Sequence, residues 1–362
     1  MLFLFSVLLF STSCAPSQKW IKSHSYDYNG LSAKLASLHK KFQDIVTIES
    51  IGETYEGRSI FSIRLSGNVP SLGEKPALMT ICAQRGIEHG ATDLCVEMIQ
   101  YLAENYGVDK RVTHLLNEAE VWVVPMMNPD GTEYDRSGLV ELFSWNKNRR
   151  PIGENAVGVE LNRNWGHNCN GPISENLAQA LSDPNSPFYA GKEPFSEKET
   201  QAIQTFLLSH KNIKVFVVYR SYFSSFIQGF VNCSRKDKSC LGTINRFARE
   251  ISNFREEKIA FVAVKSEEDL SKMLEIERRY VPFRIKRSMP KNLPLESGTF
   301  LDFAYCQMGR MAIGVTILND QDFLKNLPES RSKLVKNQAQ GILLLLTSLS
   351  DKDYSQDLFL TQ

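Results

Sequence analysis

The chain has 362 residues, of which 42% are hydrophobic and 23% are charged, as is usual for a globular protein. This length accommodates one large domain or two small ones. The net charge of +1 provides no strong positive field, which argues against a protein that binds nucleic acid or an anionic membrane through its overall charge.

Residues 1–14 have the pattern of a secretory signal peptide. An apolar run over residues 1–10 precedes small residues, and it is too short to span a bilayer as a helix. Cys14 offers an alternative, because a bacterial lipoprotein would be anchored at such a cysteine. We therefore expect a secreted or extracellular protein without a membrane span, with one domain over residues 20–350 and a C-terminal tail over residues 351–362.

Seven short apolar runs predict β-strands. They cover residues 45–51, 60–66, 77–83, 120–125, 215–219, 259–264 and 312–318. Several are apolar at consecutive positions, which is typical of strands that are covered on both faces.

Helical patterns fall between these strands, at residues 92–104, 196–209, 242–254 and 331–349. The second begins with Ser196 and has Glu199 three residues later, which predicts a capping box. Strands that alternate with helices favour an α/β layered domain. In such sheets ligands bind beyond the carboxyl ends of the strands. We expect Arg85, Asn128 and Arg220, which lie just past strand-like runs, to share a pocket there.

Six cysteines remain when residues 1–14 are removed. In an oxidising compartment disulfides are allowed, and Cys233 and Cys240, close together in a polar segment, are the best candidate pair. Cys82 lies in a strand-like run and Cys95 in a helical one, so we expect both to be buried thiols.

Three segments carry a family resemblance. They are residues 81–98 (ICAQRGIEHGATDLCVEM), 122–131 (WVVPMMNPDG) and 157–166 (VGVELNRNWG). With the Glu56-Gly57-Arg58 segment before them, they resemble the zinc metallocarboxypeptidases of the carboxypeptidase A and B type. The resemblance implies an α/β fold: a mixed, mostly eight-stranded sheet flanked by helices, with the active site at one end of the sheet.

The resemblance also implies a zinc site, and this chain departs from it. The family binds zinc through a His-x-x-Glu pair and one distant His, but the matching positions here are Arg85, Glu88 and Arg220. A guanidinium stays protonated and has no free lone pair for a metal. We therefore expect no metal and no cofactor, with both arginines in the zinc space and paired with Glu88.

The positions that carry the family's chemistry are changed as well. Its general base falls on Ile317, which cannot accept a proton. Its oxyanion-stabilising Arg falls on Asn146, which lacks the charge. Its mobile Tyr aligns with Pro294. No catalytic residue is expected.

The substrate-binding half of the family's site is retained. Asn162 and Arg163 stand where the family clamps the substrate's terminal carboxylate, a task that suits the guanidinium fork. Tyr222 is also present, and Leu301 falls at the specificity position, which implies an apolar side-chain pocket. The alternative for Asn162 and Arg163 is a buried polar network that only holds the loop.

Three functions follow from these residues. The first is a catalytically inactive, secreted carboxypeptidase-like protein that binds a peptide C-terminus or another anion. The second is an active metallocarboxypeptidase with a rearranged site, which would need His89 or His167 beside Glu88 as zinc ligands. The third is a structural or partner-binding protein that uses only the surface of the fold. The sequence has no glycine-rich phosphate loop of the expected spacing.

Overall fold

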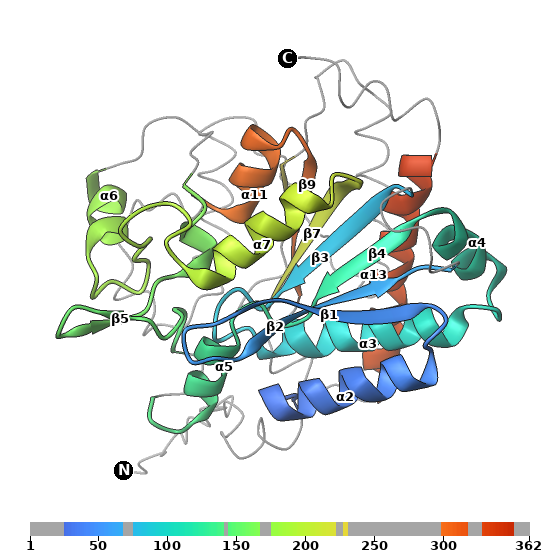
Figure 1. Cartoon of the computed structure of the whole chain (residues 1–362), viewed down its shortest axis with the longest axis horizontal. Helices are drawn as coiled ribbons and strands as arrows, with labels where there is room; N and C mark the ends of the chain where they lie inside the picture. Colours follow the sequence, from blue (N-terminus) through green and yellow to red (C-terminus); the bar gives the residue numbers. More distant parts are fainter. Residues whose placement is uncertain are drawn as a thin grey trace, which may run out of the picture.

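The protein is a layered α/β domain, shown in Figure 1 as a computed structural model. The structure describes residues 25–67, 75–140, 144–166, 175–221, 227–230, 298–317 and 328–350. Within these residues the main sheet has seven strands: β1 (Val46–Glu53), β2 (Ser59–Leu65), β3 (Ala77–Cys82), β4 (Glu120–Val124), β7 (Ile213–Ser221), β8 (Ile227–Phe230) and β9 (Met311–Ile317). A separate two-stranded ladder pairs β5 (Pro151–Ile152) with β6 (Ala156–Val157).

The strand order of the main sheet is β1-β2-β4-β3-β7-β9-β8. The four central strands, β4, β3, β7 and β9, run parallel to one another. The outer strands β1, β2 and β8 are antiparallel to their neighbours. The sheet is therefore mixed, as expected, and the carboxyl ends of its central strands meet at one edge.

Alternate residues of the central strands enter two separate hydrophobic clusters. In β3, Leu78 and Cys82 belong to one cluster, whereas Met79 and Ile81 belong to the other. This follows from the two-residue period of a strand, whose side chains point to opposite faces. Because both faces are covered by helices, every residue of β3 and β4 is buried.

Helices cover both faces of the sheet (Figure 1). On one face lie α2 (Tyr28–Lys41), α3 (His89–Asn105), α4 (Lys110–Glu118) and α13 (Pro328–Ser350). On the other lie α7 (Lys198–Ser209) and the short α11 (Phe300–Asp302), which continues into a π turn (Phe303–Gln307). The other helices in the part of the chain that the structure describes are α5 (Pro129–Arg136), α6 (Glu175–Ser182) and a 3-10 turn (Leu161–Arg163).

Six of the seven predicted strands and three of the four predicted helices are confirmed, with ends shifted by a few residues. The strand at 259–264 and the helix at 242–254 lie outside the described residues, as do Cys233 and Cys240. The capping box at Ser196 is wrong. Helix α7 has Glu197 as its N-cap without a side-chain cap, because the Ser196 hydroxyl donates to the Glu197 carboxylate at 2.6 Å instead.

The prediction of two buried thiols is wrong in its chemistry. Cys82 and Cys95 are both buried, but they form a disulfide. Cys82 ends β3 and Cys95 lies in the second turn of α3. The connection between them brings this turn back beside the end of β3, so the two Cα atoms are 6.7 Å apart. Separate strand and helix patterns in the sequence give no sign of this approach.

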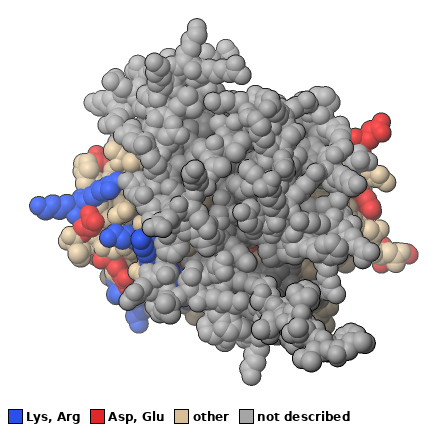
Figure 2. Space-filling model, turned by 180° about the vertical axis from the view of Figure 1, so that it is seen from behind, with Lys and Arg blue, Asp and Glu red and all other residues tan. Residues whose placement is uncertain are grey.

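No helix in the described ranges is long and apolar enough to cross a membrane. In the rear view, Lys and Arg side chains show on one side of the described surface among Asp and Glu, and the opposite side shows Asp and Glu (Figure 2). Neither sign dominates this visible surface, which agrees with the small net charge.

Candidate functional site

The candidate site lies at the edge where the parallel central strands end. Arg85 follows β3, and Arg220 is the penultimate residue of β7. Ile317 ends β9 and pairs in register with Ser221 of β7. Asn128 follows β4, but its side chain is used locally: it caps α5 by accepting from the Gly131 N–H at 3.0 Å.

Close backbone packing fixes the segment after β3. Ala83 has a φ of 52°, a left-handed conformation that is unfavourable for a residue with a Cβ. The turn is held because the Ala83 carbonyl accepts from the Asn128 N–H at 3.0 Å. At Gly86, an added Cβ would lie 2.5 Å from the carbonyl oxygens of Gly131 and Trp145. Glycine is required there, and the segment that carries Arg85 is held rigidly.

Glu88 is buried at the start of α3. Its carboxylate accepts from the Arg85 N–H at 3.2 Å and lies 3.8 Å from the Arg85 guanidinium. Burial raises the pKa of Glu88 above its ordinary value, although the positive charges of Arg85 and Arg220 act in the opposite direction. The arginines therefore do not fully offset the desolvation of this carboxyl group.

Glu160 is the closer partner of Arg85, and sequence reasoning missed it. Arg85 donates from Nε to Glu160 Oε1 at 2.6 Å, and Arg163 donates from Nε to Oε2 at 3.2 Å. Burial alone would raise the pKa of Glu160, but the two guanidinium groups lower it below its ordinary value. Glu160 is thus an ionised carboxylate that bridges two arginines.

A short 3-10 turn places Glu160 and Arg163 on the same side. Glu160 is the N-cap of this turn, and its carbonyl accepts from the Arg163 N–H at 2.8 Å. The Glu160 N–H in turn donates to the Tyr189 carbonyl at 2.8 Å. The Arg163 side chain is only 1% exposed, so its pairing with Glu160 is a buried one.

Arg220 extends this cluster toward Asn162. Its guanidinium lies 3.5 Å from the Asn162 side-chain oxygen, at the limit of a hydrogen bond. The Asn162 Nδ2 group is buried and has no hydrogen-bond partner among the residues that the structure describes. A buried donor without a partner is energetically unfavourable, and a ligand with an acceptor oxygen would satisfy it.

The other expected positions are only partly described. Asn146 lies next to the site, since its carbonyl accepts from the Gly86 N–H at 3.3 Å. Leu301 is fully buried in the cluster that contains Phe300 and Trp165. Tyr222 and Pro294 lie outside the described residues, as does His167. The roles assigned to all these positions stay predictions.

The family model of the zinc carboxypeptidases matches residues 31–338, which is most of the chain. The chain belongs to this family. Among curated relatives, it is 33% identical over 144 residues to a zinc carboxypeptidase of Saccharothrix mutabilis subsp. capreolus, over 39% of this chain and 32% of that protein. It is 32% identical over 179 residues to carboxypeptidase A2 of Mus musculus, over 49% of this chain and 40% of that protein.

One relative carries a name that bears on activity. The inactive metallocarboxypeptidase ecm14 of Schizosaccharomyces pombe is 31% identical over 240 residues, which is 63% of this chain and 43% of that protein. The chain therefore spans less than half the length of each of these three relatives.

Solved structures confirm the predicted fold class. Carboxypeptidase A from Helicoverpa armigera superposes with a TM-score of 0.65 at 21% identity, over 92% of this chain and 77% of that one. Thrombin activatable fibrinolysis inhibitor superposes with a TM-score of 0.64 at 22% identity, over 93% and 77%. At such identities the likeness establishes the fold alone.

The residues of the site do not fit the zinc of this family. Arg85 and Arg220 offer no lone pair, and the described ranges contain no group of three His, Cys, Asp or Glu side chains arranged for a metal. His89 is engaged elsewhere: its Nε2 lies 2.9 Å from Asp135 Oδ2, and both side chains are fully buried. The other oxygen of Asp135 accepts from the N–H groups of Ser144 and Trp145 at 3.0 and 2.9 Å.

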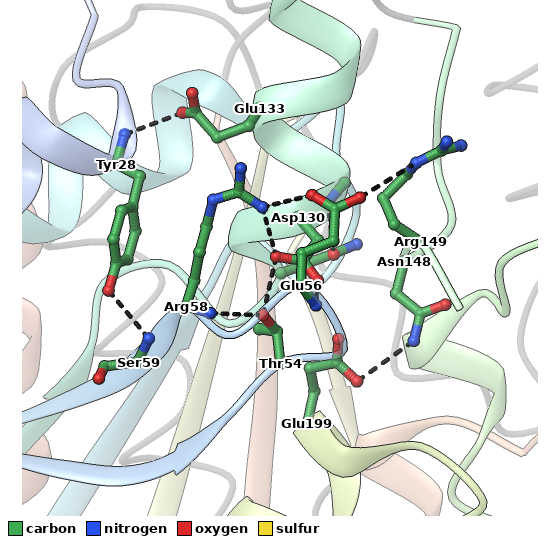
Figure 3. Close-up of polar contacts among 12 residues, drawn as sticks. Tyr28, Thr54, Glu56, Arg58, Ser59, Asp130, Glu133, Asn148, Arg149 and Glu199 are labelled. Atoms are coloured by element: carbon green, nitrogen blue, oxygen red, sulfur yellow. Dashed lines mark hydrogen bonds and ion pairs between the residues drawn. The ribbon is translucent and has the colours of Figure 1, made fainter. Parts of the chain in front are cut away.

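A polar network beside the site anchors α5 to the β1–β2 turn (Figure 3). Buried Asp130 accepts from the Thr54 hydroxyl at 2.8 Å, the Glu56 N–H at 2.9 Å and Arg58 at 2.7 Å. An open cleft of about 480 Å³ lies at this network, lined by Asp27, Glu56, Arg58, Glu133, Tyr134, Arg136 and Ser137. Its lining includes none of the candidate site residues, and its charged groups already hold the chain's own turns and helix ends.

Proposed function

We propose that this protein is a catalytically inactive member of the zinc carboxypeptidase family that binds a peptide C-terminus, or a similar anion, in the former active-site pocket. The observation that carries the proposal is the contact of 2.6 Å between Arg85 and Glu160. A family zinc ligand is replaced there by a guanidinium that is already engaged with a carboxylate. The substitutions at Ile317 and Asn146 remove the base and the charge that hydrolysis needs.

The donor chemistry of the site supports anion binding. Arg85, Arg163 and Arg220 bring three positive charges, and Glu88 and Glu160 bring two negative charges when ionised, so the sum is +1. The Asn162 Nδ2 group adds a buried donor without a described partner. A carboxylate would neutralise the cluster and satisfy this donor. The name of the Schizosaccharomyces pombe relative is consistent with loss of activity in this family.

Metal content and peptide binding test the two halves of the proposal. The purified protein is dialysed against micromolar zinc and its metal content is measured by mass spectrometry; we expect no stoichiometric zinc. Calorimetry then compares a peptide that has a free C-terminus with the same peptide as its C-terminal amide. We expect binding of the free form only, and loss of binding in Arg163→Ala. Stoichiometric zinc with hydrolysis of a blocked dipeptide would support the rearranged active enzyme instead.

A second function is favoured by the burial of Arg163. Its side chain is 1% exposed and paired with Glu160, as in a polar network that serves only the fold. In that case the protein would act through its surface alone. Equal affinity for the free peptide and the amide, or no binding of either, would favour this function over the first.

We also propose secretion through a signal peptide over residues 1–14, with a lipoprotein anchor at Cys14 as the alternative. The support is the apolar run at the N-terminus of the sequence. N-terminal sequencing of the exported protein would distinguish cleavage before Cys14, with a lipid on that cysteine, from cleavage after it.

A further inference from the structure

Glu160 already makes the contacts that an incoming carboxylate would make. Its two oxygens accept from Arg85 and Arg163 at 2.6 and 3.2 Å, and its own side chain is fully buried. Carboxylate–guanidinium hydrogen bonds of this kind are among the strong ones in proteins. Glu160 therefore has the chemistry of a bound ligand, although it belongs to the chain.

We propose that Glu160 is an internal competitor, which occupies the Nε donors of Arg85 and Arg163 and makes the pocket select carboxylates that belong to a larger chain over small free anions. This inference rests on the anion-binding function proposed above.

The competitor is held in place by the backbone. Glu160 precedes Arg163 by three residues in the 3-10 turn, and its N–H is fixed by the Tyr189 carbonyl at 2.8 Å. An intramolecular group that cannot diffuse away acts at a high effective concentration. A free carboxylate must therefore displace Glu160 from the arginines or share the arginines with it.

Selectivity follows from this exchange. A small carboxylate such as acetate would replace one carboxylate–guanidinium contact by another and would gain at most the Asn162 Nδ2 donor. A peptide C-terminus brings more, because the residues that precede its carboxylate add backbone and side-chain contacts that acetate lacks. The polypeptide can therefore compete where the isolated anion cannot.

The test compares the full chain with its Glu160→Gln variant, which keeps the size of the side chain but removes its charge. The probes are an N-acetylated pentapeptide that ends in leucine with a free carboxylate, its C-terminal amide, and sodium acetate. We expect the variant to bind the free peptide at least about tenfold more tightly, because the net charge of the cluster rises and the competitor is gone. Acetate should displace the peptide from the variant but not from the native chain.

A matched control is Glu120→Gln. Glu120 is fully buried and paired with Arg64 at the start of β4, the opposite end of the strand from the site. This change also removes a buried carboxylate from an arginine, but it should leave the affinity for the peptide unaltered. It separates the specific effect from a general loosening of the fold.

The competitor role is overturned if folded Glu160→Gln binds the peptide no more tightly than the native chain, which is the result that a purely structural role would give. If Glu160→Gln does not fold, Glu160→Asp decides: its shorter side chain cannot reach both arginines, so intermediate tightening supports the role and unchanged affinity refutes it. Binding of the free peptide by a Glu160 variant but not by the native chain also supports the competitor role. If neither the native chain nor the folded variants bind the peptide, the proposed function itself fails.

Discussion

Cys82 and Cys95 are joined by a disulfide that ties the end of β3 to the second turn of α3. The 13-residue separation between them encloses both Arg85 and Glu88. The bridge therefore closes the loop that carries two residues of the candidate site.

Removal of this bridge should lower stability. We expect Cys82→Ala with Cys95→Ala to reduce the free energy of unfolding by about 3 kcal/mol, because a loop of this length loses that much conformational freedom in the cross-linked unfolded chain. Denaturant titration of the double variant measures the effect. Substitution is preferred to a reducing agent because Cys306 is also disulfide-bonded. A double variant as stable as the native chain would show that the bridge does not constrain the loop.

Gly86→Ala should disturb the site directly. The added methyl group would meet two backbone carbonyl oxygens at 2.5 Å, which cannot move as a flexible side chain can. We expect a loss of roughly 1–3 kcal/mol in the free energy of unfolding, measured by chemical denaturation. Gly153→Ala is a useful comparison, since a Cβ added at Gly153 would have no neighbour within 4 Å and only the φ of 62° opposes it. A loss at Gly86 no larger than the loss at Gly153 would argue against the close contact as its cause.

The buried Asp93 predicts a pH dependence of stability. Burial raises its pKa from 3.8 to about 7, against the hydrogen bond from the Tyr26 N–H and the charge of Arg331. The pKa of Asp93 is higher in the folded than in the unfolded chain. Its contribution to the free energy of unfolding is therefore fully present below about pH 4 and is lost as the pH rises to about 7.

Denaturation curves at pH 5, 6, 7 and 8 test this prediction. Asp93→Asn should flatten the fall in the free energy of unfolding between pH 5 and 7. It should not abolish the fall, because burial also raises the pKa of Glu199 to about 7. If the free energy of unfolding of Asp93→Asn depends on pH as that of the native chain does, a group other than Asp93 causes the dependence.

His89→Gln separates a structural histidine from a metal ligand. We expect the loss of its contact with Asp135 to lower the free energy of unfolding by about 1–3 kcal/mol, since a buried partner is removed. Metal content after dialysis against zinc should not change. If the native protein holds zinc and this variant does not, His89 is a metal ligand and the active-enzyme alternative returns.

The sequence predicted the sheet better than the site. Continuous apolar runs marked β3, β4 and β7 because those strands are buried on both faces, and only a strand of that kind needs apolar residues at every position. Helix α2 was missed although Leu31, Leu35 and Leu38 follow a helical spacing, because polar residues outnumber them in that segment. The four residues of β8 are too few to give a pattern.

At the site, residue types were predictable but their pairing was not. Arg85 and Arg220 were placed by motif position, and the structure describes both at the same edge of the sheet. The preference of Arg85 for Glu160 over Glu88 depends on a contact between residues 75 positions apart. Such a contact is set by how the 3-10 turn docks against the segment after β3, and no local pattern encodes it.

The hydrophobic cluster beneath α3 contains residues from almost the whole domain, from Leu31 near the start of the described sequence to Leu346 near its end. Helix α13 supplies the last of them, and its Arg331 pairs with Glu97 of α3. Nearly the whole domain must therefore have emerged from the ribosome before this cluster can form. A nascent chain that lacks α13 therefore leaves the apolar residues of this cluster open to solvent.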